Sequence, residues 1–265
     1  MNKEIVFCGG GNMAEGIMKA LISKQVVTGD CITVNELLEA RRKFLTEAYG
    51  VTAVADASAG MRQAGLIIIA VNPHQVESVT KVLRPLCSEK AVIISIAAGV
   101  TLETLKSQIG SRKIARVVPN TLSQSGNGYS AVCVNELCDD RDKACIEEIL
   151  NALGQVMYLR ESMFNSFSSF SNVGPLWLYK TVEALIDSGV YIGFGRDDAR
   201  NIVIKNMLGV AQVLEQTQEH PAVRADKMTS PGGVTIEALK VLQQEGFAAA
   251  IMSSVTACFN KLSSF

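Results

Sequence analysis

Short apolar runs alternate with amphipathic segments through the first half of the chain. Residues 66–71 are continuously apolar, and residues 91–96 are apolar except for Ser95, which is typical of strands covered on both faces. Residues 14–24 and 37–49 instead repeat apolar positions at helical spacing. This alternation predicts an α/β fold with a doubly wound, mainly parallel sheet. The predicted strands are residues 4–8, 31–35, 66–71, 91–96, 114–118 and 130–134, and a further helix is expected over 139–153.

The pattern changes in the second half, where strand signals almost vanish from about Ser162 onward. Apolar spacing there predicts helices over residues 170–193, 197–218, 236–245 and 247–265. We therefore expect two domains. A Rossmann-like dinucleotide-binding domain over residues 1–160 precedes an all-α dimerisation domain over residues 161–265.

Composition narrows the classes of partner. Apolar residues make up 48% and charged residues 19% of the 265 residues, as in an ordinary globular protein. The formal net charge of −1, without a long basic run, gives no support for a nucleic-acid partner. The longest apolar stretch, from Ala91 through Val100, is too short to span a bilayer, so we expect no membrane partner.

Cysteines and histidines do not suggest a metal site. The seven cysteines are scattered without a Cys-x-x-Cys pair, and the two histidines, His74 and His220, lie far apart in the sequence. We interpret both histidines as loop or turn residues. No signal peptide is expected, because the first residues lead directly into a strand. Reduced thiols in a cytoplasmic protein are the simplest interpretation.

A glycine-rich loop follows the first predicted strand and opens the first helix. Gly9, Gly11 and Ala14 match the G-x-G-x-x-G/A pattern of dinucleotide-binding domains. Gly9 permits the tight turn, and Gly11 lets the backbone approach a pyrophosphate. Unpaired amides where the helix begins, at Asn12 and Met13, can then bind the phosphates. The alternative is a turn of purely structural importance between strand and helix.

The end of the second predicted strand bears on the choice of cofactor. An acidic residue there would bind the ribose hydroxyls and favour NAD, but the position is Asn35, with Glu36 one place later. A neutral side chain repels a 2′-phosphate less, and Arg41 or Arg42 would pair with it. We therefore expect NADP, with NADPH preferred and NADH possible. Alternatively, both arginines lie on a solvated helix face.

A second informative loop, Thr229-Ser230-Pro231-Gly232-Gly233-Val234-Thr235, lies between two predicted helices. Pro231 and the glycines break one helix, and Thr235 falls within the first turn of the next. The unpaired amides and the dipole of that helix suit a small carboxylate, and the Ser230 and Thr235 hydroxyls add hydrogen bonds. A plain inter-helix turn capped by Thr235 is the alternative.

These two loops complete a resemblance to the pyrroline-5-carboxylate reductase family that extends over nearly the whole chain. The shared motifs occur in order: GGGNMAE (Gly9–Glu15), AVNP (Ala70–Pro73), SIAAGV (Ser95–Val100), RVVPNT (Arg116–Thr121) and TSPGG (Thr229–Gly233) with Thr235. The segments 183–193 and 219–221 are also similar. The glycine loop is common to many dehydrogenases, whereas its combination with TSPGG is specific.

The resemblance implies NADPH- or NADH-dependent reduction of the cyclic imine 1-pyrroline-5-carboxylate to L-proline. It implies that the substrate carboxylate lies against Ser230, Gly232, Gly233, Val234 and Thr235, and that the Thr235 hydroxyl meets the ring nitrogen as the catalytic residue. It further implies a homodimer with interlocked helical domains, and larger rings of dimers. The implied nicotinamide pocket consists of Val71, Asn72, Pro73, Ala97, Ala98, Pro119 and Asn120.

Three positions depart from the family pattern. Asn72 stands where the family usually has lysine, and Leu122 replaces the second proline of PNTP. The family's SGSGPAY is Ser-Asn-Val-Gly-Pro-Leu-Trp over residues 171–177. The bulkier stretch would reshape the substrate pocket, so the exact imine stays open.

Two other functions fit parts of the sequence. A β-hydroxyacid-type dehydrogenase would use a lysine after a glycine-rich segment, and Lys180 follows Gly174, but Ala184 replaces the expected asparagine. A catalytically idle dinucleotide-binding regulator is the alternative from another class, although an idle site would not need Thr235.

Overall fold

The computed structural model describes residues 4–264, and the chain divides into two compact units at residues 172 and 173. An eight-stranded sheet forms the centre of the first unit, in the order β3-β2-β1-β4-β5-β6-β7-β8. Neighbouring strands pair in parallel except β6 and β7, which confirms the predicted mainly parallel sheet. The strands are β1 (Ile5–Cys8), β2 (Ile32–Asn35), β3 (Thr52–Val54), β4 (Leu66–Ile69), β5 (Val92–Ser95), β6 (Lys113–Pro119), β7 (Gly128–Val134) and β8 (Gly154–Tyr158).

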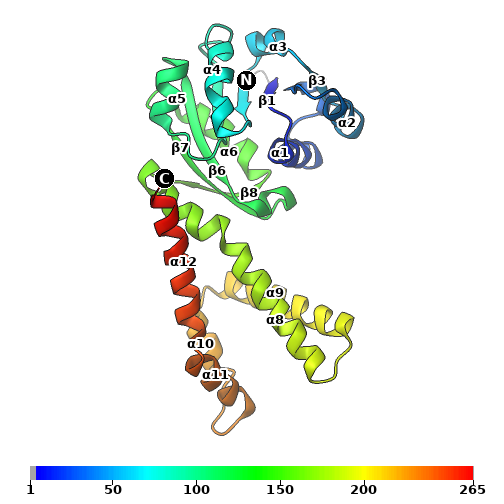
Figure 1. Cartoon of the computed structure of the whole chain (residues 1–265), viewed down its shortest axis with the longest axis vertical. Coiled ribbons are helices and arrows are strands. Elements are labelled where there is room, and N and C mark those ends of the chain that lie inside the picture. Colours follow the sequence, from blue (N-terminus) through cyan, green and yellow to red (C-terminus); the bar gives the residue numbers. More distant parts are fainter. Residues whose placement is uncertain (1–3, 265) are drawn as a thin grey trace. The chain divides into compact units, whose positions relative to one another are not determined.

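Helices cover both faces of this sheet (Figure 1). Alternate strand residues such as Phe7 and Ile68 pack with α1, α2 and α6, whereas Val6 and Ile67 pack with α3, α4 and α5. The period-2 alternation of side chains thus gives every central strand two apolar faces, which is why those strands read as continuous apolar runs. The helices are α1 (Asn12–Ser23), α2 (Glu39–Tyr49), α3 (Ser58–Gln63), α4 (Val76–Leu83), α5 (Leu102–Ile109), α6 (Asp140–Asn151) and the short α7 (Phe164–Phe167).

The sequence did not reveal the two edge strands. β3 has three residues, and β8 keeps most of its side chains partly or fully exposed. Neither carries a buried apolar run, so pairing with β2 and β7 decides their conformation.

The helical region begins earlier than predicted. The expected helix over residues 170–193 is preceded by α7 and a π-helical segment (Ser168–Asn172), and α8 (Gly174–Tyr191) follows. Phe164, 1% exposed, lies under the Arg116 guanidinium at 4.7 Å. Glu161 also pairs with Arg116 at 2.7 Å. These contacts attach residues 161–172 to the sheet unit, which extends to Asn172.

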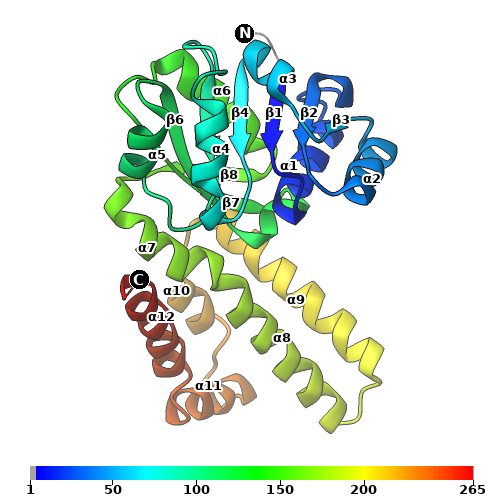
Figure 2. The ribbon, with the colours of Figure 1, turned by 45° about the horizontal axis from the view of Figure 1, so that its top comes forward.

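The second unit consists of helices in its described residues. α8 and α9 (Arg196–Thr217) pack against each other, as Figure 2 shows, and α10 (Pro221–Asp226), α11 (Val234–Gln244) and α12 (Phe247–Ser263) follow. The Trp177 indole donates a hydrogen bond to Ser254 Oγ, which joins α8 to α12. Many large apolar side chains of these helices stay exposed, among them Tyr191 at 91% and Met252 at 70%. An apolar surface of this extent is typical of a subunit interface.

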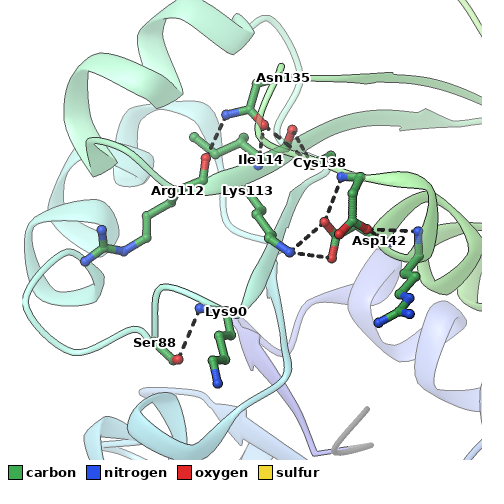
Figure 3. Close-up of polar contacts among 10 residues, drawn as sticks. Ser88, Lys90, Arg112, Lys113, Ile114, Asn135, Cys138 and Asp142 are labelled. Carbon is green, nitrogen blue, oxygen red and sulfur yellow. Dashed lines mark hydrogen bonds and ion pairs between the residues drawn. The ribbon is translucent and has the colours of Figure 1, made fainter.

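A polar cluster holds β6 beside α6 (Figure 3). Asn135 accepts a hydrogen bond from the Ile114 amide and donates one to the Arg112 carbonyl. The Lys113 ammonium lies 2.7 Å from Asp142 Oδ2, and the Asp142 side chain is only 2% exposed. The hydrogen bond to Asp142 raises the pKa of Lys113. The contribution of the Lys113 charge to stability is therefore present in the neutral range and is lost as pH rises through that raised pKa.

We expect Lys113→Met to lower the free energy of unfolding by about 2 kcal/mol, because it leaves the Asp142 charge buried without its partner. Urea titration measures the change. A double variant, Lys113→Met with Asp142→Asn, should recover more than half of the loss. Lys106→Met serves as the control, since its pair with Glu136 is largely exposed and should contribute little. Equal losses in the single and double variants would contradict a charge effect.

Candidate active site

The predicted cofactor residues meet at one edge of the sheet. β1, β4, β5 and β6 are adjacent and parallel, so their carboxyl ends lie side by side. Open α/β sheets bind ligands at this edge, where the strand order reverses between β1 and β4. The residues at or just beyond the ends of these four strands are Gly9–Gly11, Val71–Pro73, Ala97–Ala98 and Pro119–Asn120.

The glycine loop has the geometry that a pyrophosphate requires. Gly9 has φ of +103°, and a β-carbon there would lie 2.6 Å from the Ala70 carbonyl oxygen. A β-carbon at Gly11 would meet no described atom within 4 Å, so the glycine leaves open space at the start of α1. Gly11 caps α1 without a side chain, and Asn12 beside it is exposed. The loop thus leaves room for the phosphates of a dinucleotide beside the first turn of α1.

Asn35 and Glu36 both lie against this loop. The Asn35 carbonyl accepts the Gly9 amide at 2.9 Å, while its side-chain Nδ2 donates to the Ala55 carbonyl at 2.7 Å. The Asn35 amide nitrogen is therefore turned toward the segment after β3. The carboxylate next to the glycines belongs to Glu36, whose Oε2 accepts the Gly10 amide at 3.1 Å.

The two candidate arginines are already engaged by the protein. Arg41 donates to the Gly10 carbonyl and lies 2.5 Å from the Glu15 carboxylate. The Tyr49 hydroxyl donates to the same carboxylate, and that bond, followed by the contact with Arg41, keeps the pKa of Glu15 below its usual value. Arg42 donates to the Glu36 and Leu37 carbonyls. Sequence reasoning missed this network, because no local pattern pairs residues 15, 41 and 49.

The turns after β4 and β5 contain residues of the predicted nicotinamide pocket. Asn72 is exposed, and its backbone amide donates to Gln75 Oε1, so the turn begins a short helical segment at Pro73. Ala97 is 3% exposed, and Ala98 beside it is exposed. The Ala97 amide donates to Ser95 Oγ at 3.4 Å.

Asn120 is the best anchored residue of the group. It is 6% exposed, its Oδ1 accepts the Tyr129 amide, and its Nδ2 donates to Ser171 Oγ at 3.3 Å. Pro119 before it is also buried. The Asn120 side chain thereby connects β7 with the first residue of the divergent 171–177 stretch.

The TSPGG loop forms a tight turn directly before α11. Gly232 has φ of +70°, and the Gly233 amide donates to the Ser230 carbonyl at 3.0 Å. A β-carbon at Gly233 would collide with Ser230 Oγ. Val234 begins α11 and is 89% exposed, and Thr235 is its second residue. No side chain caps α11, so its first amides lack a side-chain partner within the described residues, and the carboxylate interpretation remains a prediction.

A helix cap and ion pairs stabilise the segment before this loop. His220 accepts the Ala222 amide through Nδ1 and so caps α10, which agrees with its interpretation as a turn residue. Glu219 pairs with Arg224 and Lys227, and the Lys227 hydrogen bond lowers the pKa of Glu219. Lys180, which a β-hydroxyacid dehydrogenase would need, is exposed and paired with Glu183.

Other kinds of site find no support in the part of the chain that the structure describes. Residues 4–264 contain no group of three His, Cys, Asp or Glu side chains suited to a metal ion. None of the described helices is long and apolar enough to cross a membrane. Burial raises the pKa of the Cys8 thiol to about 12, so that thiol is inert at neutral pH.

Fold and loop geometry together define the class: an NAD(P)-dependent oxidoreductase with an all-helical dimerisation domain. Residues 161–264 match the family model described as pyrroline-5-carboxylate reductase dimerisation, and residues 4–99 match that of NADP oxidoreductases, coenzyme F420-dependent. The chain is 32% identical over 263 residues to the pyrroline-5-carboxylate reductase of Synechocystis, covering 98% of this chain and 97% of the relative. It belongs to the pyrroline-5-carboxylate reductase family.

Solved structures show the same fold. A pyrroline-5-carboxylate reductase from Coxiella burnetii superposes with a TM-score of 0.91 at 30% identity, covering 100% of this chain and 98% of that one. The Plasmodium falciparum pyrroline carboxylate reductase, solved with NADP bound, gives a TM-score of 0.86 at 24% identity and covers 98% and 97% of the two chains.

Proposed function

We propose that this enzyme reduces 1-pyrroline-5-carboxylate to L-proline, the last step of proline biosynthesis, with Thr235 as the catalytic residue. The observation that supports the assignment is that one chain contains two loops suited to the two ligands of this reaction. The Gly9–Gly11 loop leaves room for a dinucleotide phosphate, and the Ser230–Thr235 loop places two hydroxyl residues at the uncapped start of α11, where a carboxylate would be bound.

Each group has a defined part in this reaction. NAD(P)H supplies the hydride when bound at the strand ends. The Ser230 hydroxyl and the amides of Gly232, Gly233 and Val234 hold the substrate carboxylate. The Thr235 hydroxyl hydrogen-bonds the ring nitrogen and so fixes the imine carbon for transfer. A protonated imine already carries positive charge, and therefore the site needs no strong general acid.

The remaining cofactor contacts follow from the strand ends. The amides of Asn12 and Met13 with Gly9 and Gly11 hold the pyrophosphate, and Asn35 lies where the adenosine half begins. We assign the nicotinamide half to Val71, Asn72, Pro73, Ala97, Ala98, Pro119 and Asn120. Asn72 replaces a charged residue with a neutral amide at this edge, so we expect the pocket to bind nicotinamide without a fixed cation there.

The exposed apolar faces of α8 to α12 support an interlocked homodimer, because these side chains are too numerous for a free surface. We also propose that the dimers assemble into larger rings. We also propose a cytoplasmic location, where reduced thiols are usual.

The decisive experiment follows NAD(P)H oxidation by absorbance with 1-pyrroline-5-carboxylate as substrate. We expect rapid oxidation that requires the imine and yields proline in equal amount. The same assay with an open-chain β-hydroxyacid and NAD(P)⁺ should give no turnover, since Lys180 is paired with Glu183. Cofactor binding without imine turnover would favour the idle regulator instead and would overturn the assignment.

A further inference from the structure

We infer that Glu36 is the residue that determines the selectivity between NADH and NADPH in this enzyme. The inference rests on the proposed cofactor site but does not depend on which imine is reduced. It is based on the position of the Glu36 carboxylate. In the sequence Glu36 lies one residue after the end of β2, where the ribose-binding acid is expected, but in the structure its carboxylate lies beside the glycine loop.

The Glu36 carboxylate is fixed against the glycine loop by two backbone amides. Its Oε2 accepts the Gly10 amide at 3.1 Å, and its Oε1 accepts the Leu38 amide at 2.9 Å. A β-carbon at Gly10 would lie 3.1 Å from Oε2, so the carboxylate lies directly beside the loop. An acidic group at the end of the second strand is suited to bind the 2′- and 3′-hydroxyls of the adenosine ribose.

Neighbouring side chains do not offer an alternative ribose acid among the residues described. Asn35 is neutral and donates its amide to the Ala55 carbonyl. Glu15, the other carboxylate near the loop, accepts the Tyr49 hydroxyl and pairs with Arg41. Of the two carboxylates near the loop, Glu15 is paired with a side-chain cation, whereas Glu36 forms no ion pair within the described residues.

The nearby cations do not cancel the Glu36 charge. The Arg41 guanidinium divides its bonds between Glu15 and the Gly10 carbonyl. Arg42 donates through Nη1 to the backbone carbonyls of residues 36 and 37, not to the Glu36 carboxylate. A 2′-phosphate at the ribose would therefore meet a negative carboxylate, whereas the plain hydroxyls of NADH would find an acceptor.

The test measures dissociation constants of NADH and NADPH by calorimetric titration in the absence of any imine. Glu36→Gln removes the charge and keeps an oxygen that accepts the amide hydrogen bonds. We expect NADPH to bind more tightly and NADH more weakly, so that the ratio of the two constants shifts about tenfold toward NADPH. The matched control, Glu39→Gln on the exposed first turn of α2, should leave the ratio unchanged.

The outcomes separate a selective role from a structural one. If Glu36→Gln weakens both cofactors by the same factor, or changes neither, the inference is wrong. Glu36→Ser is the second variant: it also loses the amide contacts, so total affinity falls, but the ratio should still shift toward NADPH. Because no imine is present, a failed reduction assay would leave this result intact, and a constant ratio would not affect the reductase assignment.

Discussion

Gly11→Ala is expected to weaken NAD(P)H binding by about a hundredfold while the protein keeps its melting temperature. At φ of −68° and ψ of −179°, Gly11 has a backbone conformation open to any residue, and a β-carbon there would meet no described protein atom within 4 Å. The added methyl therefore costs the fold almost nothing. It would occupy the space through which a pyrophosphate reaches the amides of α1.

Gly9→Ala provides the contrast for this prediction. The left-handed φ of +103° and the close approach to the Ala70 carbonyl oxygen predict a loss of about 3 kcal/mol in the free energy of unfolding. Thermal melts and cofactor titrations of the two variants together separate binding from folding. An unchanged cofactor affinity in Gly11→Ala would show that the pyrophosphate does not approach this turn.

Thr235→Ala is expected to lower kcat/KM for imine reduction by about ten- to a hundredfold, the cost of one hydrogen bond to a charged group. The affinity for NAD(P)H measured without imine should not change, because Thr235 is assigned to the substrate and not to the cofactor. Steady-state kinetics with varied imine at saturating cofactor measures the effect.

Two further variants sharpen this test. Thr235→Ser keeps the hydroxyl and should retain most of the activity. Thr256→Ala, an exposed threonine whose hydroxyl bonds only the Met252 carbonyl among the contacts seen, should behave as wild type. Full activity in Thr235→Ala would remove the threonine from the mechanism and leave the carboxylate contacts as the function of the loop.

The sequence by itself determined the elements whose signals are local. Continuous apolar runs identified the central strands β4 and β5, because both faces of those strands are covered. The glycine pattern located the dinucleotide loop, since only glycine tolerates the φ of Gly9 and its approach to Ala70. The TSPGG loop and the helix after it were likewise readable, because proline and glycine interrupt the helical pattern just before α11 and leave that helix without a side-chain cap.

Tertiary structure decided the features that join distant residues. Edge strands β3 and β8 exist because β2 and β7 pair with them, and their short sequences carry no buried run. Residues 161–172 belong to the sheet unit because Arg116 pairs with Glu161 and covers Phe164, contacts separated by some forty-five positions in the chain. The position of an acidic residue in the sequence could not show that Glu36, rather than Asn35, faces the glycine loop. The amides of Gly10 and Leu38 donate hydrogen bonds to the Glu36 carboxylate and fix its orientation. The direction of that side chain depends on the backbone conformation after β2, which the position in the sequence does not reveal.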